Sequence, residues 1–351
     1  MTTEAPRQPF AALAGRRPSP VGLLGLVFVG ALVFWLAVNL VKGPAIFFEV
    51  TAIGITNGCV YALVALGYTL VYGILELINF AHGDVFMLGG MFSITYAVSL
   101  FGLHSGEGIA IVPIVFATLI LAMLSCGLVN AAIEIVAYRP LRNAPRLAPL
   151  ITAIGMSFIV ENVGQAWKGS NYVTMPDVLP HSDVFHIGSF DYQWNKLIAL
   201  IITVPVLIGL TYLIQRTRQG KAMRATAQDK DASAMMGINV NRTISFTFLI
   251  AGALAGAAGL VYSLYFTSVR YDQGFQLGLI AFTAAVLGGI GNLPGAVLGA
   301  VLIGLLQGWN EGLSWRAPGS DWTESIVFTI LILILVFRPS GLLGEQTPEG
   351  G

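Results

Sequence analysis

The sequence predicts an all-α polytopic membrane protein, on the basis of three observations. Of the 351 residues, 56% are hydrophobic and only 10% are charged, whereas a soluble domain carries roughly 25% charged residues. The mean hydropathy is +0.78. Apolar runs of the length that crosses a hydrocarbon core, roughly 20 residues, follow one another along the chain. They are continuous rather than alternating, which argues against a β-barrel.

We expect about ten transmembrane helices in a single domain, residues 21–338. Residues 1–20 are polar and proline-containing, so we expect a disordered tail there. The apolar run after Arg17 is longer than the roughly 7–15 residues of a signal-peptide core, and we interpret it as a retained span. Residues 339–351 form a second tail. The expected spans are 21–41, 50–75, 84–101, 109–137, 148–167, 197–215, 243–267, 275–290, 295–313 and 325–337.

The distribution of basic residues predicts the orientation, because short cytoplasmic loops are rich in Lys and Arg. With the amino terminus inside and ten alternating spans, 13 of the 18 basic residues fall inside and 5 outside. Both termini and the loop 216–242 are then cytoplasmic, and the loop 168–195 is external. The external loop is either a lid or docking surface, or a plain connector.

Charge and cysteine content exclude several classes of function. The net charge is zero, so no bulk charge indicates a nucleic-acid partner. Cys59 and Cys126 lie in apolar runs, and their spacing predicts neither a metal site nor a disulfide framework. Glu134, Glu161 and Glu311 lie near span ends, where we expect them at the membrane interface.

A polar cluster interrupts the apolar sequence near residue 80, where Glu76, Asn79, His82 and Asp84 lie between two apolar runs. Ionisable groups at membrane depth are costly and usually face a pathway or a partner. Gly83 permits a turn or a close approach of backbone, and Asn79 is a candidate helix cap. The cluster therefore braces the inner mouth of a pathway, or it is a solvated turn at the inner surface. One His and two carboxylates are a weak signal for a metal.

Glycine concentrates in two stretches, 251–260 and 285–300. In lipid, small residues let helices pack backbone to backbone, and we expect tight packing to explain the first stretch. The second also contains helix breakers, and a broken helix is tolerated only where protein or a water-filled cavity satisfies the backbone. It is either a functional break or re-entrant turn on a substrate pathway, or tight packing alone. The breakers are Gly288, Gly289, Gly291, Pro294 and Gly295. No residue-level match identifies the two halves of the chain as repeats.

The most polar internal segment is 219–242. From Lys221 until Gly237 it contains no Gly or Pro, and its Ala, Met, Lys, Arg and Gln suit one helix or two short ones. Gly237 supplies a carboxy-terminal stop, and Asn239 or Asn241 caps the next span. Its small residues favour a groove in a soluble partner, since nearly all the rest of the chain lies in the membrane. A helix lying on lipid would carry more Leu, Phe or Trp on one face.

Five stretches follow in order along the chain: GYTLVYGILELINFAHGDVFMLGG, VAYRPLRNAPRLAPLITAIG, RATAQDKDASAMMGINVNR, FTAAVLGGIGNLPGAVLGA and RPSGLLG. Together they resemble the permease subunits of branched-chain amino acid ABC importers, the LivH type, over nearly all of the chain from about residue 50. The resemblance implies the ABC importer permease architecture in a bacterial inner membrane. It also implies a second permease subunit, two ATPase subunits and an external substrate-binding protein.

In ABC importers a cytoplasmic E-A-A-x-x-x-G loop docks on the ATPase. Its counterpart here is Asp231-Ala232-Ser233 followed by Gly237, with Asp replacing Glu and Ser replacing the second Ala. The expected ATPase-coupling residues are therefore Lys221, Arg224, Asp231, Ala232, Ser233 and Gly237.

The chain has no G-x-x-x-x-G-K-[ST] phosphate loop, so we expect no enzyme activity, no cofactor of its own and ATP use by partner subunits. The resemblance implies transport of branched-chain amino acids or a related small amino acid or amide. One alternative is a self-sufficient channel or secondary transporter for a small polar solute such as urea or an amide. Another is a membrane enzyme using His82 and Asp84 as acid–base groups, but it lacks a credible nucleophile.

Overall fold

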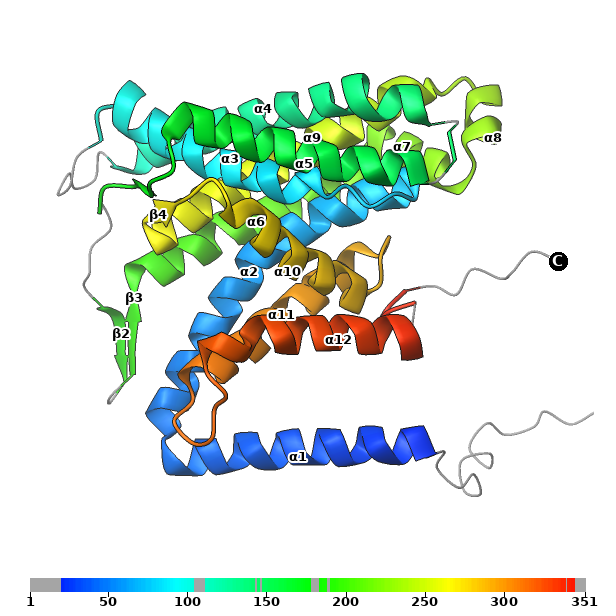
Figure 1. Ribbon diagram of the computed structural model, residues 1–351. Coiled ribbons are helices and arrows are strands. Elements are labelled where there is room, and N and C mark those ends of the chain that lie inside the picture. Colours follow the sequence, from blue (N-terminus) through cyan, green and yellow to red (C-terminus); the bar gives the residue numbers. More distant parts are fainter. Residues whose placement is uncertain are drawn as a thin grey trace, which may run out of the picture.

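The computed structural model is a bundle of helices (Figure 1). It describes residues 20–103, 111–142, 144–145, 147–177, 183–187, 190–338 and 340–344. The tail predicted for residues 1–20 lies almost wholly outside the described residues, as does most of the tail 339–351. The helices are α1 Pro20–Lys42, α2 Pro44–Leu75, α3 Ala81–Thr95, α4 Ile111–Ile133, α5 Leu147–Lys168, α6 Trp194–Arg216, α7 Arg218–Gln228, α8 Lys230–Met235, α9 Val240–Phe266, α10 Gln273–Gly288, α11 Leu293–Gly312 and α12 Thr323–Phe337.

Short irregular helices and four short strands complete the fold. π-Helical turns extend α3 (Tyr96–Leu100) and α4 (Glu134–Tyr138), and 3-10 turns occupy Arg139–Leu141 and Ser320–Trp322. The antiparallel pairs are β1 Val173–Thr174 with β4 Ser268–Val269, and β2 Asp183–Ile187 with β3 Phe190–Gln193.

In the part of the chain that the structure describes, eight helices are long and apolar enough to cross a membrane. Two shorter apolar helices are Gly30–Lys42, within α1, and α10. Each of the ten expected spans coincides with one of these helices, which confirms the all-α polytopic class. The count of ten crossings itself stays a prediction.

The core is built around α2 and α9, which are buried over most of their length, whereas few residues of α12 are fully buried. α2 packs along α11, and α9 along α4. Glycines permit both approaches: a Cβ added to Gly58 of α2 would lie 2.7 Å from the Cα of Val301, and one added to Gly256 of α9 would lie 3.0 Å from the Cα of Met123. Contacts this close leave no room for a side chain, so the tight packing expected for 251–260 is confirmed.

The helix packing repeats between the two halves. α3 packs on α5 as α10 packs on α12, and α2 packs on α11 as α9 packs on α4. The first set of helices is α2 to α5 and the second is α9 to α12. Their first helices, α2 and α9, run in opposite directions (Figure 1). This arrangement is typical of the inverted repeats of transporters. The sequence did not reveal it, because the two halves show no residue-level match.

Two helices begin inside the bundle rather than at its ends. A Cβ added to Gly83, in the first turn of α3, would lie 2.8 Å from the Cα of Gly278 in α10, and one added to Gly274 would lie 2.7 Å from the Cα of Asp84. The first turns of α3 and α10 therefore touch. The helices that precede them, α2 and α9, end at opposite ends of the bundle. The connectors 76–80 and 267–272 must run back into the protein, as in the discontinuous helices of transporters.

The segments expected in the cytoplasm lie at one end of the bundle. α8, the start of α1 and the end of α12 are on the right in Figure 1, whereas the β2–β3 hairpin is at the opposite end. This arrangement is compatible with the charge-based orientation, which itself stays a prediction.

Candidate coupling site and interior polar cluster

The polar segment 219–242 forms the two short helices α7 and α8, as expected. Asp229 begins α8, because its side chain accepts hydrogen bonds of 2.9 Å from the backbone N–H groups of Asp231 and Ala232. Gly237 ends it with a φ of +83°. Of the two candidate caps for the next span, Asn239 caps α9 through a 3.0 Å bond from the N–H of Arg242.

The end of α8 has the hydrogen bonding of a Schellman motif. The N–H of Ile238 donates to the carbonyl of Ser233, and the N–H of Gly237 to that of Ala234, both at 3.0 Å. The chain thereby reverses within a few residues, from the tip of α8 into the first turn of α9. A residue with a Cβ would be strained at this φ.

α7 is anchored in the chain itself, so the expectation that the whole segment lacks an internal partner is wrong. Gly220, Met223 and Thr226 are buried, and α7 packs on α2, α6 and α9. A Cβ at Gly220 would collide with the backbone carbonyls of Leu213 and Ile214. The absence of a side chain at Gly220 lets α7 fold back against the end of α6.

The free surface is the tip of α8. Met235 and Met236 are 82% and 83% exposed, although methionine is an apolar residue that normally fills cores or adaptable binding surfaces. Ser233 faces the protein and is buried, so it cannot face a partner without rearrangement. Ala232 is half-buried. The other expected coupling residues, Lys221, Arg224, Asp231 and Gly237, are exposed.

Sequence reasoning passed over the two methionines as ordinary helix formers. The signal that could have found them is two adjacent large apolar residues directly before a glycine stop, in an otherwise polar segment. We name Asp231, Ala232, Met235 and Met236 the α8 surface.

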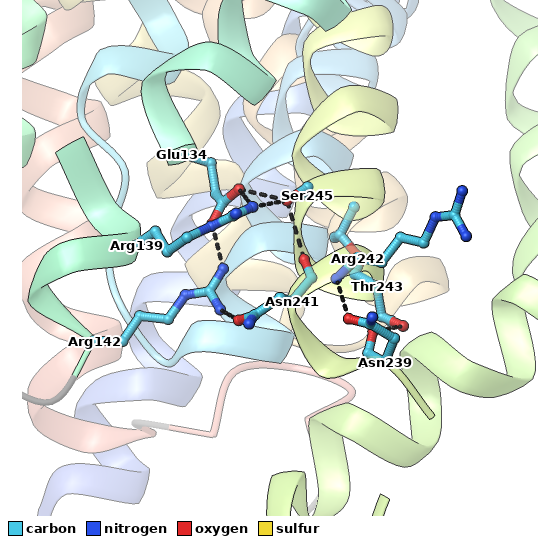
Figure 2. A network of polar contacts seen from close by, with 9 residues as sticks. Glu134, Arg139, Arg142, Asn239, Asn241, Arg242, Thr243 and Ser245 are labelled. Atoms are coloured by element: carbon cyan, nitrogen blue, oxygen red, sulfur yellow. Dashed lines mark hydrogen bonds and ion pairs between the residues drawn. The ribbon is translucent and has the colours of Figure 1, made fainter. Parts of the chain in front are cut away.

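Behind the α8 surface, a network of charged side chains joins α9 to the connection between α4 and α5 (Figure 2). Glu134 has a fully buried side chain and accepts hydrogen bonds from Arg139 at 3.1 Å, from Ser245 at 2.6 Å and from Arg142. Arg142 also donates to the side chain of Asn241 at 2.6 Å. Glu134 lies at the end of α4, and two guanidinium groups and a hydroxyl compensate the burial of its side chain. Its expected position at the membrane interface stays a prediction.

This network connects directly to the segment that contains α7 and α8. Asn241 and Ser245 lie in the first turns of α9, which starts four residues after the end of α8. Burial lowers the pKa of the Arg142 guanidinium, and Glu134 opposes that shift. The start of α9 thus joins α8 to the α4–α5 connection through the hydrogen bonds of Asn241 and Ser245.

Most of the cluster near residue 80 lies in the interior, whereas its first member, Glu76, is exposed at the end of α2. Asn79, His82 and Asp84 are at most 1% exposed, so the interpretation as a solvated turn is wrong. Asp84 accepts a hydrogen bond from Ser157 of α5, and Asn79 accepts one of 2.6 Å from the hydroxyl of Tyr138. These bonds are possible because the connector 76–80 carries the start of α3 into the bundle.

Details of the cluster differ from the expectations. Asn79 is not a cap, because α3 has no side-chain cap. Gly83 provides close approach rather than a turn, since it packs against Gly274 and Gly278. Oδ1 of Asp84 has no hydrogen-bond partner within the described ranges. A carboxylate oxygen is thus left at the meeting point of two helix amino termini.

The second glycine stretch forms a turn between two helices. α10 ends at Gly288, Gly289 has a φ of +108° and Gly291 one of +93°. Asn292 caps α11 by accepting a 2.9 Å bond from the N–H of Gly295, and Pro294 lies in the first turn of α11. The region is therefore a hairpin turn rather than a break within one span.

The carboxy-terminal RPSGLLG segment closes this turn. The N–H groups of Leu342 and Leu343 donate to the carbonyls of Leu287 and Gly288 at 2.8 and 3.0 Å. From Gly274 to Gly288 there are 14 residues of α10, or about 21 Å of helix. The structure therefore does not bring the glycine turn and the Asp84 cluster together.

Comparisons with known proteins identify a matching family and close relatives of this chain. Residues 50–336 match the family described as branched-chain amino acid transport system / permease component. The chain is 39% identical over 300 residues to the high-affinity branched-chain amino acid transport system permease protein BraD of Pseudomonas aeruginosa, covering 84% of this chain and 95% of BraD. It is 38% identical over 304 residues to the corresponding permease protein LivH of Escherichia coli K12, with the same two coverages.

Proposed function

This chain belongs to the family of permease components of branched-chain amino acid transport systems, and on that premise we propose how it carries out transport. It forms part of the pathway for branched-chain amino acids or a related small amino acid or amide across a bacterial inner membrane. Separate ATPase subunits supply the energy. A second permease subunit and an external binding protein complete the importer.

We propose the α8 surface as the docking element for an ATPase subunit. The observation that carries this proposal is the pair of exposed methionines at the tip of α8, on a helix whose ends are held by Asp229 and Gly237. Exposed apolar side chains on a polar tip are costly in water and become favourable when a partner buries them. Lys221 and Arg224 are exposed on α7 and supply positive charge.

We propose that a displacement of the α8 surface is transmitted into the helix bundle. The start of α9 is bonded to Glu134 and Arg142 through Ser245 and Asn241. Tyr138, between those two charged residues in sequence, donates to Asn79 of the interior cluster. These hydrogen bonds, joined by the backbone from Glu134 to Arg142, support a route by which docking on the ATPase biases the position of α3.

We propose that Asn79, His82, Gly83 and Asp84 brace the pathway rather than perform chemistry. They meet α10 and α5 at the point where two helices begin inside the bundle. Polar groups at such discontinuities are typical of transporter sites. For the turn Gly288, Gly289, Gly291 and Pro294, we propose a supporting role, as the hinge that holds α10 against α11.

A self-sufficient channel or secondary transporter is not favoured, because the relatives are permease proteins of transport systems with separate components. The test is reconstitution of the complete complex in vesicles. Uptake of leucine that requires ATP, the ATPase subunits and the binding protein supports the proposal. Uptake by this chain alone, independent of ATP, contradicts it.

A further inference from the structure

A hollow of about 340 Å³ opens beside the start of α8, and its lining includes Glu76 of the polar cluster and Arg142 of the charged network. Four parts of the chain line it: the end of α2, the connector that leads to α3, the α4–α5 connection and α5, and α8 itself. Ligand pockets span roughly 300–1,000 Å³. The hollow is therefore large enough for a molecule of amino-acid size and small for a nucleotide.

The charges in the hollow are of both signs. Glu76 contributes a carboxylate and Lys230 an ammonium group, and neither forms an ion pair with another described residue. The third charged group is Arg142, whose charge is already matched by Glu134. One free anion and one free cation complement the ammonium and carboxylate groups of a zwitterion. A phosphate would instead call for several unmatched cations.

The remaining lining is mostly apolar, apart from the hydroxyl group of Tyr72. Leu75, Leu77, Ile78 and Leu150 contribute branched aliphatic side chains, and Pro149 lies beside them. All four branched residues are partly exposed, so a ligand side chain that covers them would remove apolar surface from water. This lining suits a branched aliphatic side chain better than a charged or strongly polar one.

We propose that this hollow binds a branched-chain amino acid from the cytoplasmic side and thereby inhibits import. The inference rests on the proposed function for the substrate class and for the role of α8. Glu76 ends α2 with a φ of +55° and starts the connector to the interior cluster, whereas Lys230 is the first residue of α8. A ligand that bridges them holds α8 against the connector.

Inhibition of import follows from the thermodynamic linkage between ligand binding and the arrangement of α8. Docking and transport require α8 to move relative to the bundle, and a ligand that binds one arrangement better shifts the equilibrium towards it. Accumulated product would then slow its own import. Couplings of this kind are typically about 5–150-fold, and we expect about fivefold or more.

The test uses the complete complex in vesicles that contain ATP, with external binding protein. Initial uptake of radiolabelled leucine is measured after preloading with unlabelled leucine or with the same concentration of glycine. The readout is the ratio of the two rates for each protein, so differences in basal activity cancel. In the wild type, preloaded leucine should lower uptake about fivefold or more relative to glycine.

Two variants have matched controls. Glu76→Gln removes the anion, and Leu150→Trp fills the hollow; both should bring the ratio close to one. Glu324→Gln removes an exposed carboxylate elsewhere, and Ile151→Trp adds the same bulk at a neighbouring position that is 68% exposed and outside the hollow. Both controls should keep the wild-type ratio.

The outcomes separate the two proposals. If the wild type takes up leucine but preloading has no effect, the hollow is not an inhibitory site, and the proposed function stands. The same holds if Glu76→Gln and Leu150→Trp are inhibited like the wild type. If no ATP-dependent leucine uptake occurs at all, the proposed function fails, and this inference fails with it.

Discussion

Substitution of Gly237 measures how much the exact ending of α8 matters for docking. Gly237 has a φ of +83°, and nothing lies within 4 Å of a Cβ added there. A side chain would therefore meet no steric obstacle, and its cost is that of the left-handed backbone alone, about 1–2 kcal/mol for a residue such as valine. Asparagine tolerates this conformation better.

The strain should affect binding more than folding. In the free protein the exposed end of α8 unwinds to relieve it, breaking the two hydrogen bonds to the carbonyls of Ser233 and Ala234. Docking requires the native ending, since that ending positions Met235 and Met236. Gly237→Val should therefore weaken ATPase binding by up to about 5–30-fold, the equivalent of 1–2 kcal/mol, and Gly237→Asn by less than about threefold.

The assay is titration of the purified permease in detergent with the ATPase subunit. Gly209→Val is the matched control, because Gly209 of α6 also has nothing within 4 Å of its added Cβ but does not have a positive φ. It should bind like the wild type. Equal affinity for Gly237→Val, Gly237→Asn and the wild type would refute the reasoning, as would equal weakening by Gly209→Val.

Three further predictions test the rest of the account. Glu134→Gln leaves two arginines without their buried partner and should cost about 1–3 kcal/mol, seen as a lower thermal unfolding temperature in detergent; an unchanged temperature, relative to Glu324→Gln, would contradict the network. Asp84→Asn combined with His82→Gln should impair uptake in vesicles while leaving ATPase assembly intact, and full uptake would reject a pathway role. In a background lacking the buried Cys59 and Cys126, an impermeant maleimide should label Tyr172→Cys but not Met236→Cys in intact cells; the reverse pattern would overturn the orientation.

Much of the fold was predictable because its signals are local. Continuous apolar runs predicted ten segments that all prove to be helices. The stop at Gly237 and the cap at Asn239 were also predictable, since both depend on the conformational and hydrogen-bonding preferences of single residues. The order and relatedness of the five motifs identified the family.

The interior contacts were not predictable, because they join residues far apart in sequence. Glu134 is buried only because Ser245, 111 residues later, meets it together with two arginines. Asn79 meets Tyr138 across 59 residues. The sequence placed Glu134 at the membrane interface and left Asn79 open between a pathway and a solvated turn. Only the packed bundle supplies the partners that make burial of both side chains favourable.

The glycine turn shows a different limit. Gly288, Gly289 and Gly291 signal a break in the helix, but sequence periodicity does not distinguish a break within one span from a turn between two. The deciding contact comes from the carboxy-terminal segment, where Leu342 and Leu343 bond the last carbonyls of α10. Those bonds are a tertiary feature.

The most direct test of the central claim is ATP-driven leucine uptake by the reconstituted complex with an altered α8 surface. Met235→Asp combined with Met236→Asp places two charges on the surface that we propose to be buried by the ATPase, without touching a membrane helix. The account predicts that the wild type accumulates leucine only with ATP, ATPase subunits and binding protein, and that the variant inserts normally but neither binds the ATPase nor accumulates leucine. Wild-type accumulation by the variant, or accumulation by this chain alone without ATP, would contradict it.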